Sequence, residues 1–142
     1  MICADTSFLI SFYGNDLLTD EARRQMRPVR QIAVHAVIDY EFANALRLLV
    51  FRGKLLPLAR KRMMSDYEAD KAAGVLLSKD VEQSRLFSEA ERLSDKYTVT
   101  AGHRAYDILQ VAAALQLGAT EFWSFDGKQR ALAQAEGLKV GP

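Results

Sequence analysis

The sequence predicts an α/β protein built on a short, mainly parallel sheet with helices on both faces. Short apolar segments alternate with longer segments of helical periodicity along the whole chain, and this alternation is typical of parallel strands joined by helices. The 142 residues are 49% hydrophobic and 26% charged, which is the balance of an ordinary globular domain. No linker, repeat or low-complexity tract divides the chain, so we expect one domain over residues 1–142.

The first half of the chain is expected to begin with a strand. Residues 2–4 are apolar, and Asp5 with the following hydroxyls offers a cap for a helix that carries Phe8 to Phe12. A helix that stops before Pro28, a strand rich in Ile and Val, and a long apolar helix follow over residues 20–26, 31–37 and 38–52.

The second half continues the alternation. Helices are expected over residues 58–73, 81–96, 106–117 and 128–136, and strands over 75–77, 121–125 and 138–140. Asp80 is the expected cap of the helix over 81–96. Glycines at positions 53, 74, 118 and 137 are expected to end the helices that precede them.

The composition excludes several classes of protein. Nineteen Lys and Arg against eighteen Asp and Glu give a net charge of +1, so a nucleic-acid partner would need a local basic patch. A single cysteine excludes an internal disulfide, and with two histidines beside it no four-ligand zinc site can form. The apolar stretches are far shorter than the roughly 18 residues that span a bilayer, and the N-terminus lacks the basic start of a signal peptide. We expect a cytoplasmic protein without a membrane partner.

Four acidic residues stand in apolar surroundings, where a charge is costly. Asp5 and Asp126 follow apolar strands, at the strand ends where open α/β sheets bind their ligands. Glu41 lies near the start of an apolar helix, and Asp107 is the only charged residue in the segment 106–117. One shared divalent cation would explain all four, because carboxylate oxygens suit Mg²⁺ or Mn²⁺.

Each acid also has a structural explanation when it is taken alone. Asp5 and Asp126 can cap the helices that follow them, and the helix dipole favours Glu41 near a helix N-terminus. Asp107 is harder to explain in this way, since an ionised carboxylate in a buried helix needs a cation or several donors. Asp39 is two residues from Glu41 and is therefore expected on another side of that helix.

Other catalytic chemistry has less support. Cys3 is interpreted as a small buried hydrophobe, and His35 as a core histidine whose ring is hydrogen-bonded. Ser7 and Ser124 have no Gly-x-Ser-x-Gly context and no evident histidine partner, so a serine triad is not predicted. No glycine-rich phosphate loop is present either.

A metal held by carboxylates indicates phosphate chemistry. Such a cation can activate a water and neutralise charge on a phosphoryl oxygen, so hydrolysis of a phosphodiester is expected. An acidic site needs basic residues nearby to receive a polyanion. The candidates are Arg23, Arg24, Arg27, Arg30, Arg47, Arg52, Lys54, Arg60, Lys61, Arg62 and Arg104. A solvated helix face explains residues 60–62 equally well.

Four segments carry a family resemblance. They are Ile2-Cys3-Ala4-Asp5-Thr6-Ser7, the helix over residues 40–47, the segment 104–112 and the segment 121–126, and residues 129–133 and 137–140 add a similar ending. In this order and at these separations, they resemble a PIN-domain ribonuclease, and more narrowly the VapC-type toxin of a toxin–antitoxin pair.

The resemblance implies a three-layer α/β/α fold and an active site in which Asp5, Glu41, Asp107 and Asp126 bind one or two Mg²⁺ or Mn²⁺ ions. It implies endonucleolytic cleavage of RNA by an activated water, which leaves a 5′-phosphate and a 3′-hydroxyl. The implied partners are RNA and an antitoxin protein, and the expected assembly is a homodimer.

The resemblance also implies a set of supporting residues that orient the carboxylates or touch substrate. These are Thr6, Ser7, Asn44, Arg104 and Ser124. Gln110 departs from the pattern, because many relatives have histidine three residues after the aspartate. Since glutamine cannot titrate near neutrality, a proton-transfer role at this position is in doubt.

Other functions remain open at this point. An RNA-processing nuclease of the same fold, without an antitoxin, would have the same residues. A noncatalytic PIN-fold binding domain is less consistent with four intact acids. A phosphorylation-receiver domain needs paired acids after its first strand, and Asp5-Thr6 supplies only one.

Overall fold

The computed structural model describes residues 1–29 and 31–142, so Arg30 lies outside the described residues. Its strands are β1 (Ile2–Ala4), β2 (Ile32–Val34), β3 (Leu76–Ser78), β4 (Glu121–Trp123) and β5 (Lys139–Gly141). Its helices are α1 (Thr6–Tyr13), α2 (Thr19–Met26), α3 (Ala36–Phe51), α4 (Pro57–Ala72), α5 (Gln83–Ala101), α6 (Ala105–Gln116) and α7 (Gly127–Ala135).

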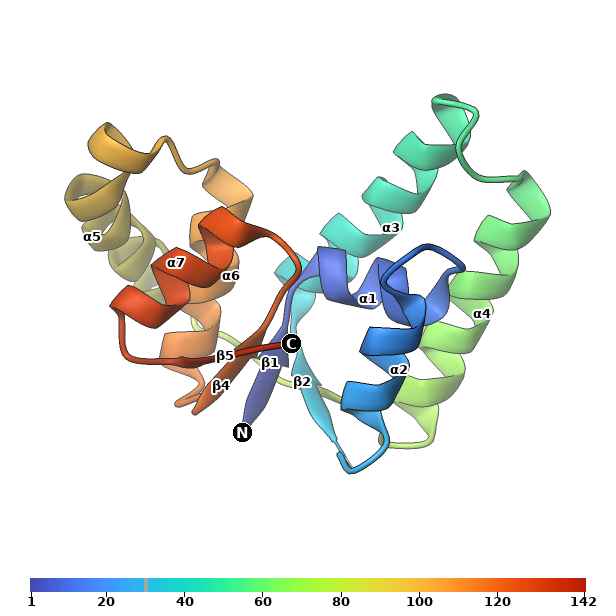
Figure 1. Ribbon diagram of the computed structural model, residues 1–142. Coiled ribbons are helices and arrows are strands. Elements are labelled where there is room, and N and C mark those ends of the chain that lie inside the picture. Colours follow the sequence, from blue (N-terminus) through green and yellow to red (C-terminus); the bar gives the residue numbers. More distant parts are fainter. Residues whose placement is uncertain (30) are drawn as a thin grey trace.

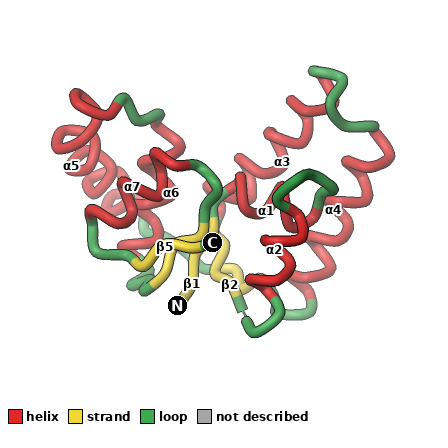
Figure 2. The backbone as a smooth tube through the Cα atoms, in the orientation of Figure 1, coloured by secondary structure: helices red, strands yellow, loops and turns green. Residues whose placement is uncertain are grey.

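The strands form one parallel sheet in the order β3-β2-β1-β4-β5. Figure 1 shows α1 to α4 on one side of this sheet and α5 to α7 on the other. The short strands lie between the two helical layers in Figure 2. The predicted α/β class and the three layers are therefore confirmed.

The strand order places a topological switch point at β1. The chain steps from β1 to β2 and β3 in one direction, and it then returns to β4 on the opposite side of β1. Open α/β sheets bind ligands at such a point, beyond the carboxyl ends of the strands. Asp5 follows β1 and Asp126 lies shortly after β4, so the topology brings two of the predicted acids to one place.

Two apolar cores, one on each face of the sheet, hold the layers together. Cys3 and Phe122 are paired across β1 and β4 and belong to the core under α5 to α7. Their neighbours Ala4 and Trp123 are also paired, and they belong to the core under α1 to α4. Because side chains alternate between the two faces of a strand, even a strand of three residues contributes side chains to both cores.

Two predicted boundaries are wrong. The strand expected over 31–37 ends at Val34, because His35 is the N-cap of α3 and the helix begins at Ala36. Similarly, the strand expected over 121–125 ends at Trp123, and Asp126 caps the helix that follows. In both places the chain leaves the sheet early to begin a helix.

The predicted cap at Asp80 is also wrong. Glu82 is the N-cap of α5, and its side chain accepts hydrogen bonds from the backbone N–H groups of Ser84 and Arg85. The helix runs past the predicted end at residue 96 and stops at Gly102, whose φ is +65°. Glycine adopts this left-handed conformation without a steric penalty.

The core position of His35 is as expected, but the expected hydrogen bonding of its ring is wrong at Nδ1. The residue is buried, and its Nδ1 has no partner among the described residues. Burial lowers the pKa of this imidazole to about 4.

Cys3 lies in the core, as expected of a small apolar residue. Burial raises the pKa of its thiol to about 12, so the thiol stays neutral. None of the helices described is long and apolar enough to cross a membrane.

Candidate active site

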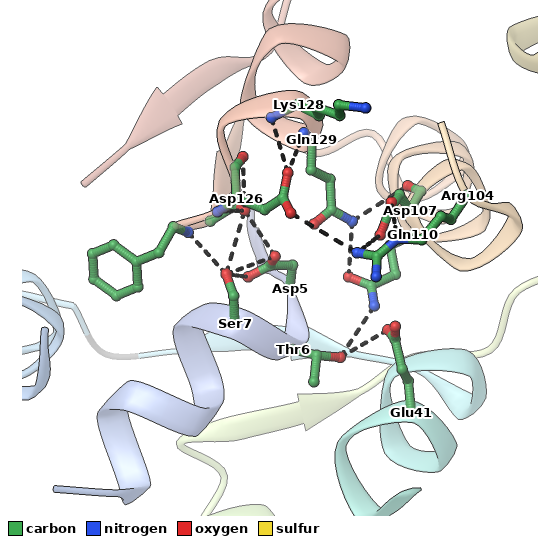
Figure 3. A network of polar contacts seen from close by, with 12 residues as sticks. Asp5, Thr6, Ser7, Glu41, Arg104, Asp107, Gln110, Asp126, Lys128 and Gln129 are labelled. Atoms are coloured by element: carbon green, nitrogen blue, oxygen red, sulfur yellow. Dashed lines mark hydrogen bonds and ion pairs between the residues drawn. The ribbon is translucent and has the colours of Figure 1, made fainter. Parts of the chain in front are cut away.

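The four acids predicted from the sequence line one pocket of about 180 Å³. Asp5 and Asp126 come from the ends of β1 and β4, while Glu41 and Asp107 come from the first two turns of α3 and α6. Figure 3 shows their side chains converging from these elements. The fold therefore brings together carboxylates that are separated by up to 121 positions in the sequence.

Asp5 is held by hydrogen bonds on both carboxylate oxygens. The Phe8 backbone N–H donates to Oδ1 at 2.8 Å, and this bond caps α1. The Ser7 hydroxyl lies 2.8 Å from both oxygens, and the Ser124 hydroxyl donates to Oδ2 at 2.7 Å. Burial nevertheless raises the pKa of Asp5 to about 6, with a smaller contribution from Glu41 in the same direction. An ionised Asp5 is thus costly here without a cation.

A directed chain of hydrogen bonds connects Glu41 to the other side of the pocket. The Thr6 hydroxyl donates to Glu41 Oε2 at 2.8 Å and accepts from Gln110 Nε2 at 3.2 Å. Gln129 Nε2 in turn lies 3.3 Å from both Gln110 Oε1 and the backbone carbonyl of Asp107. Burial raises the pKa of Glu41, and the charge of Asp107 raises it further. The two glutamine side chains therefore connect Thr6, which binds Glu41, to the backbone of Asp107 without adding charge.

Among the described residues, Arg104 is the basic side chain that forms ion pairs with the acids of the pocket. Its Nε and Nη2 donate to the Asp107 carboxylate at 3.0 and 3.3 Å, and its Nη2 lies 3.9 Å from Asp126 Oδ2. The bonds to Asp107 raise the pKa of Arg104. Asp107 is buried, whereas 77% of the Arg104 side chain is exposed. The guanidinium therefore approaches a buried carboxylate from the solvent side.

Asp126 combines a capping role with a position in the pocket. Its Oδ1 accepts from the backbone N–H groups of Lys128 and Gln129 at 2.9 and 3.0 Å, which caps α7. Its Oδ2 faces Arg104. The capping explanation weighed for Asp5 and Asp126 is therefore correct, and it does not compete with a place in the acidic site.

The remaining predicted residues divide into two groups. Thr6, Ser7 and Arg104 line the pocket, and the buried Ser124 reaches it through Asp5. Asn44 is half-buried on α3 and is not among the described residues that line this pocket. On the same helix, Asp39 accepts hydrogen bonds from Tyr67 and Lys71 of α4, at 2.6 and 3.1 Å. Asp39 therefore lies outside the acidic site, as its spacing from Glu41 predicts.

Sequence reasoning missed Gln129 as a member of the site. It lies three residues after Asp126, as Gln110 does after Asp107. Because residues three apart share a helix face, this repeated spacing is a signal from which Gln129 could have been predicted.

The donor set fits Mg²⁺ or Mn²⁺ in its chemistry. All four acids offer oxygen ligands, and burial raises the pKa of Asp5 despite its hydrogen bonds, so an ionised Asp5 gains from a bound cation. Among the residues that the structure describes, no three or more Asp, Glu, His or Cys side chains are arranged as they would be around a metal ion. Arg104 provides a positive charge at Asp107 in this arrangement.

Fold and site together define an α/β protein that gathers four carboxylates at the switch point of a parallel sheet. The sequence pattern of the PIN domain family matches residues 2–135, so the chain belongs to this family. No curated protein gives a significant match.

Solved structures with a similar fold have low sequence identity to the chain. VapC20 of Mycobacterium tuberculosis, described as a Sarcin-Ricin loop cleaving toxin, aligns over 100% of both chains with a TM-score of 0.71 and 19% identity. FitAcB of Neisseria gonorrhoeae aligns over 100% of this chain and 97% of its own, with a TM-score of 0.67 and 17% identity. PAE2754 of Pyrobaculum aerophilum aligns over 98% of this chain and 82% of its own, with a TM-score of 0.60 and 16% identity. At these identities the comparison concerns the fold.

Proposed function

We propose that the protein is a Mg²⁺- or Mn²⁺-dependent endoribonuclease and the toxin of a toxin–antitoxin pair. The observation that carries this proposal is the convergence of four carboxylates, two of them buried, in one pocket of a PIN domain. Similarity of fold to VapC20, a toxin that cleaves the Sarcin-Ricin loop, supports RNA as the substrate. Because VapC20 is described as a toxin, we propose an antitoxin as the partner protein and a homodimer as the assembly.

Asp5, Glu41, Asp107 and Asp126 are the proposed metal ligands. Bound there, Mg²⁺ or Mn²⁺ would lower the pKa of a water and neutralise charge on a phosphoryl oxygen. Ser7 and Ser124 orient Asp5, and Thr6 orients Glu41, through the hydrogen bonds described above.

Arg104 has a proposed role in substrate binding. A guanidinium binds a phosphate through the same fork of donors with which it binds a carboxylate. Because most of the Arg104 side chain is exposed, it can exchange Asp107 for a phosphate of the RNA. Arg104 thereby offsets the repulsion between an acidic pocket and a polyanion.

The experiment that tests this function is cleavage of RNA by the purified chain. We expect cleavage with Mg²⁺ or Mn²⁺, products with a 5′-phosphate, and complete loss of activity in EDTA. Loss of a group that only orients a metal ligand costs roughly 10- to 100-fold, so Asp107→Asn, which removes a proposed ligand, should lower the rate by about 100-fold or more.

The control is Glu68→Gln, which removes an exposed acid on α4 outside the pocket. It should cleave at the wild-type rate. Undiminished cleavage in excess chelator, or by Asp107→Asn, would contradict the metal site.

A further inference from the structure

Two exposed tyrosines, one on α3 and one on α6, stack on each other. Tyr40 of α3 and Tyr106 of α6 have ring centroids 6.0 Å apart and an interplanar angle of 29°. Each directly precedes an acid of the pocket, since Tyr40 is followed by Glu41 and Tyr106 by Asp107. The pair therefore joins the two helices that bring Glu41 and Asp107 together.

The tyrosines are not part of either apolar core. Tyr40 is 56% exposed and Tyr106 is 41% exposed, and neither belongs to the buried clusters on the two faces of the sheet. Phe51 and Phe87 are also strongly exposed, but neither of them precedes an acid of the pocket. The contact between α3 and α6 uses the two rings against each other, but their exposed surfaces have no role in the apolar cores.

The tyrosine pair and the nearby Arg104 could bind the base and the phosphate of a nucleotide. Flat aromatic faces stack on unpaired bases, and an exposed guanidinium binds phosphate. Arg104 is two residues before Tyr106 and has a largely exposed side chain. The stacking face, the phosphate-binding cation and the proposed metal ligands Glu41 and Asp107 consequently lie in two short segments, residues 40–41 and 104–107, at the start of two contacting helices.

We propose that Tyr40 and Tyr106 form a stacking platform for an unpaired base of the RNA, next to the phosphate that is cleaved. This inference rests on the proposed nuclease function and adds to it a requirement for single-stranded substrate at this point. A base in a duplex is stacked between its neighbours and cannot lie on the tyrosine rings without leaving the helix.

The experiment measures RNA binding separately from cleavage. Asp5→Asn protein in Mg²⁺ is titrated against a fluorescently labelled single-stranded RNA, and the Kd is determined by fluorescence anisotropy. In this background Tyr40→Ala and Tyr106→Ala should each raise the Kd roughly 5- to 100-fold, the range that loss of one base–aromatic stack produces. Tyr40→Phe and Tyr106→Phe should bind within about twofold of the parent, because phenylalanine keeps the ring.

Salt dependence and duplex binding separate stacking from electrostatics. The tyrosine variants should leave the slope of log Kd against log salt unchanged, whereas Arg104→Ala should lower it by about one phosphate contact. Binding of the same sequence as a duplex should be insensitive to the tyrosines. Phe87→Ala, an exposed aromatic on α5, is the matched control and should bind as the parent does.

The outcomes distinguish this inference from the proposed function. If the wild-type chain neither binds nor cleaves RNA, the proposed function fails. If it cleaves RNA and Arg104→Ala weakens binding while both tyrosine variants bind normally, the stacking platform alone is wrong. Size-exclusion chromatography with light scattering gives the third outcome. A fall in solution mass in Tyr40→Ala or Tyr106→Ala, with RNA affinity unchanged per folded protomer, would make the pair a protein interface and overturn the inference.

Discussion

At the scale of single residues, Asp5 combines a stabilising contact with a destabilising charge. Its Oδ1 caps α1 through the Phe8 N–H, and such caps typically stabilise a helix by about 1 kcal/mol. Its burial raises the carboxyl pKa from 3.8 to about 6, so the folded protein holds a proton that the unfolded chain releases. The free energy of unfolding therefore falls as pH rises between these values, by roughly 3 kcal/mol at 1.36 kcal/mol per pKa unit.

Asp5→Asn should accordingly stabilise the metal-free protein at alkaline pH. The amide keeps an oxygen for the Phe8 N–H and carries no charge, so we expect a melting temperature about 3–10 °C above wild type at pH 8 in EDTA. The advantage should shrink at pH 5, where wild-type Asp5 is mostly protonated. Differential scanning calorimetry at both pH values measures this. A lower melting temperature for the variant at pH 8 would mean that Asp5 acts chiefly as a cap.

Arg104→Ala should change metal and RNA affinity in opposite directions. The guanidinium and a metal ion compete for the Asp107 carboxylate under the proposed function, and the ion pair is solvent-exposed on the arginine side. Exposed pairs contribute about 0.2–1 kcal/mol, so Mn²⁺ affinity by isothermal titration calorimetry should rise by no more than about fivefold. RNA affinity should fall. Weaker Mn²⁺ binding by the variant would place Arg104 among the groups that support the metal site.

The individual acids could be predicted from the sequence because an acid in an apolar segment is conspicuous. Asp107 in the segment 106–117 is the clearest case. Composition alone does not single out Gln110 and Gln129, since glutamine is common on helix surfaces; the family pattern draws attention to Gln110, and only the repeated spacing points to Gln129. Their role depends on a hydrogen bond between α6 and α7, and a contact of this kind exists only once the fold is formed.

At the scale of elements, helix ends position the site more than the strands do. Asp5 and Asp126 each cap a helix directly beyond a strand, so the carboxylate is fixed at the sheet edge by the same bonds that begin the helix. Local sequence carries this information, and these two helix starts were predictable. The start of α5 was not, because Asp80 is a preferred type of cap and Glu82 is not, yet Glu82 caps the helix.

Glu136 provides a test of how α5 and α7 are joined. This residue follows α7 and accepts hydrogen bonds from Arg92, Lys96 and Tyr97 of α5, the last two at 3.0 and 2.6 Å. Hydrogen bonds from Arg92 in particular lower the pKa of Glu136 to about 2. A lowered carboxyl pKa adds stability that is present above about pH 4.5 and is lost as pH falls towards 2.

Glu136→Gln should therefore destabilise the protein at pH 7 and have much less effect at about pH 2. Because the basic partners are partly exposed and screened by solvent, the expected loss at pH 7 is only about 1 kcal/mol, measured by urea denaturation. High salt should reduce it. Glu91→Gln, an exposed acid on α5, is the control. An equal loss at both pH values would show that packing of the side chain, rather than its charge, joins the helices.

At the scale of the whole molecule, the order of the strands explains why one pocket contains all four acids. With β1 at the centre of the sheet and β4 beside it, Asp5 and Asp126 are neighbours, and α3 and α6 approach from opposite faces with Glu41 and Asp107. The alternation of strands and helices predicts the class of fold but not this order, since an alternating chain is compatible with several strand orders. The family resemblance implied one site for the four acids, but the strand order comes from the structure.

Expression of the protein in a growing cell tests whether it is a toxin. A chain that cleaves RNA needed for translation should arrest growth when it is expressed alone in a bacterium, and co-expression of its antitoxin, sought as the small protein encoded beside it, should restore growth. Asp5→Asn should be harmless without any partner at the same level of soluble protein, because it removes a proposed metal ligand. Glu68→Gln should arrest growth as the wild type does.

Two outcomes would change the conclusion in different ways. Normal growth on strong expression of soluble wild type, together with RNA cleavage in vitro, would favour an RNA-processing nuclease that works without an antitoxin. Equal arrest by wild type and Asp5→Asn would mean that the harm does not depend on the acidic pocket. In that case measurement of RNA integrity in the arrested cells would show intact RNA, and the nuclease would not be the cause of the arrest.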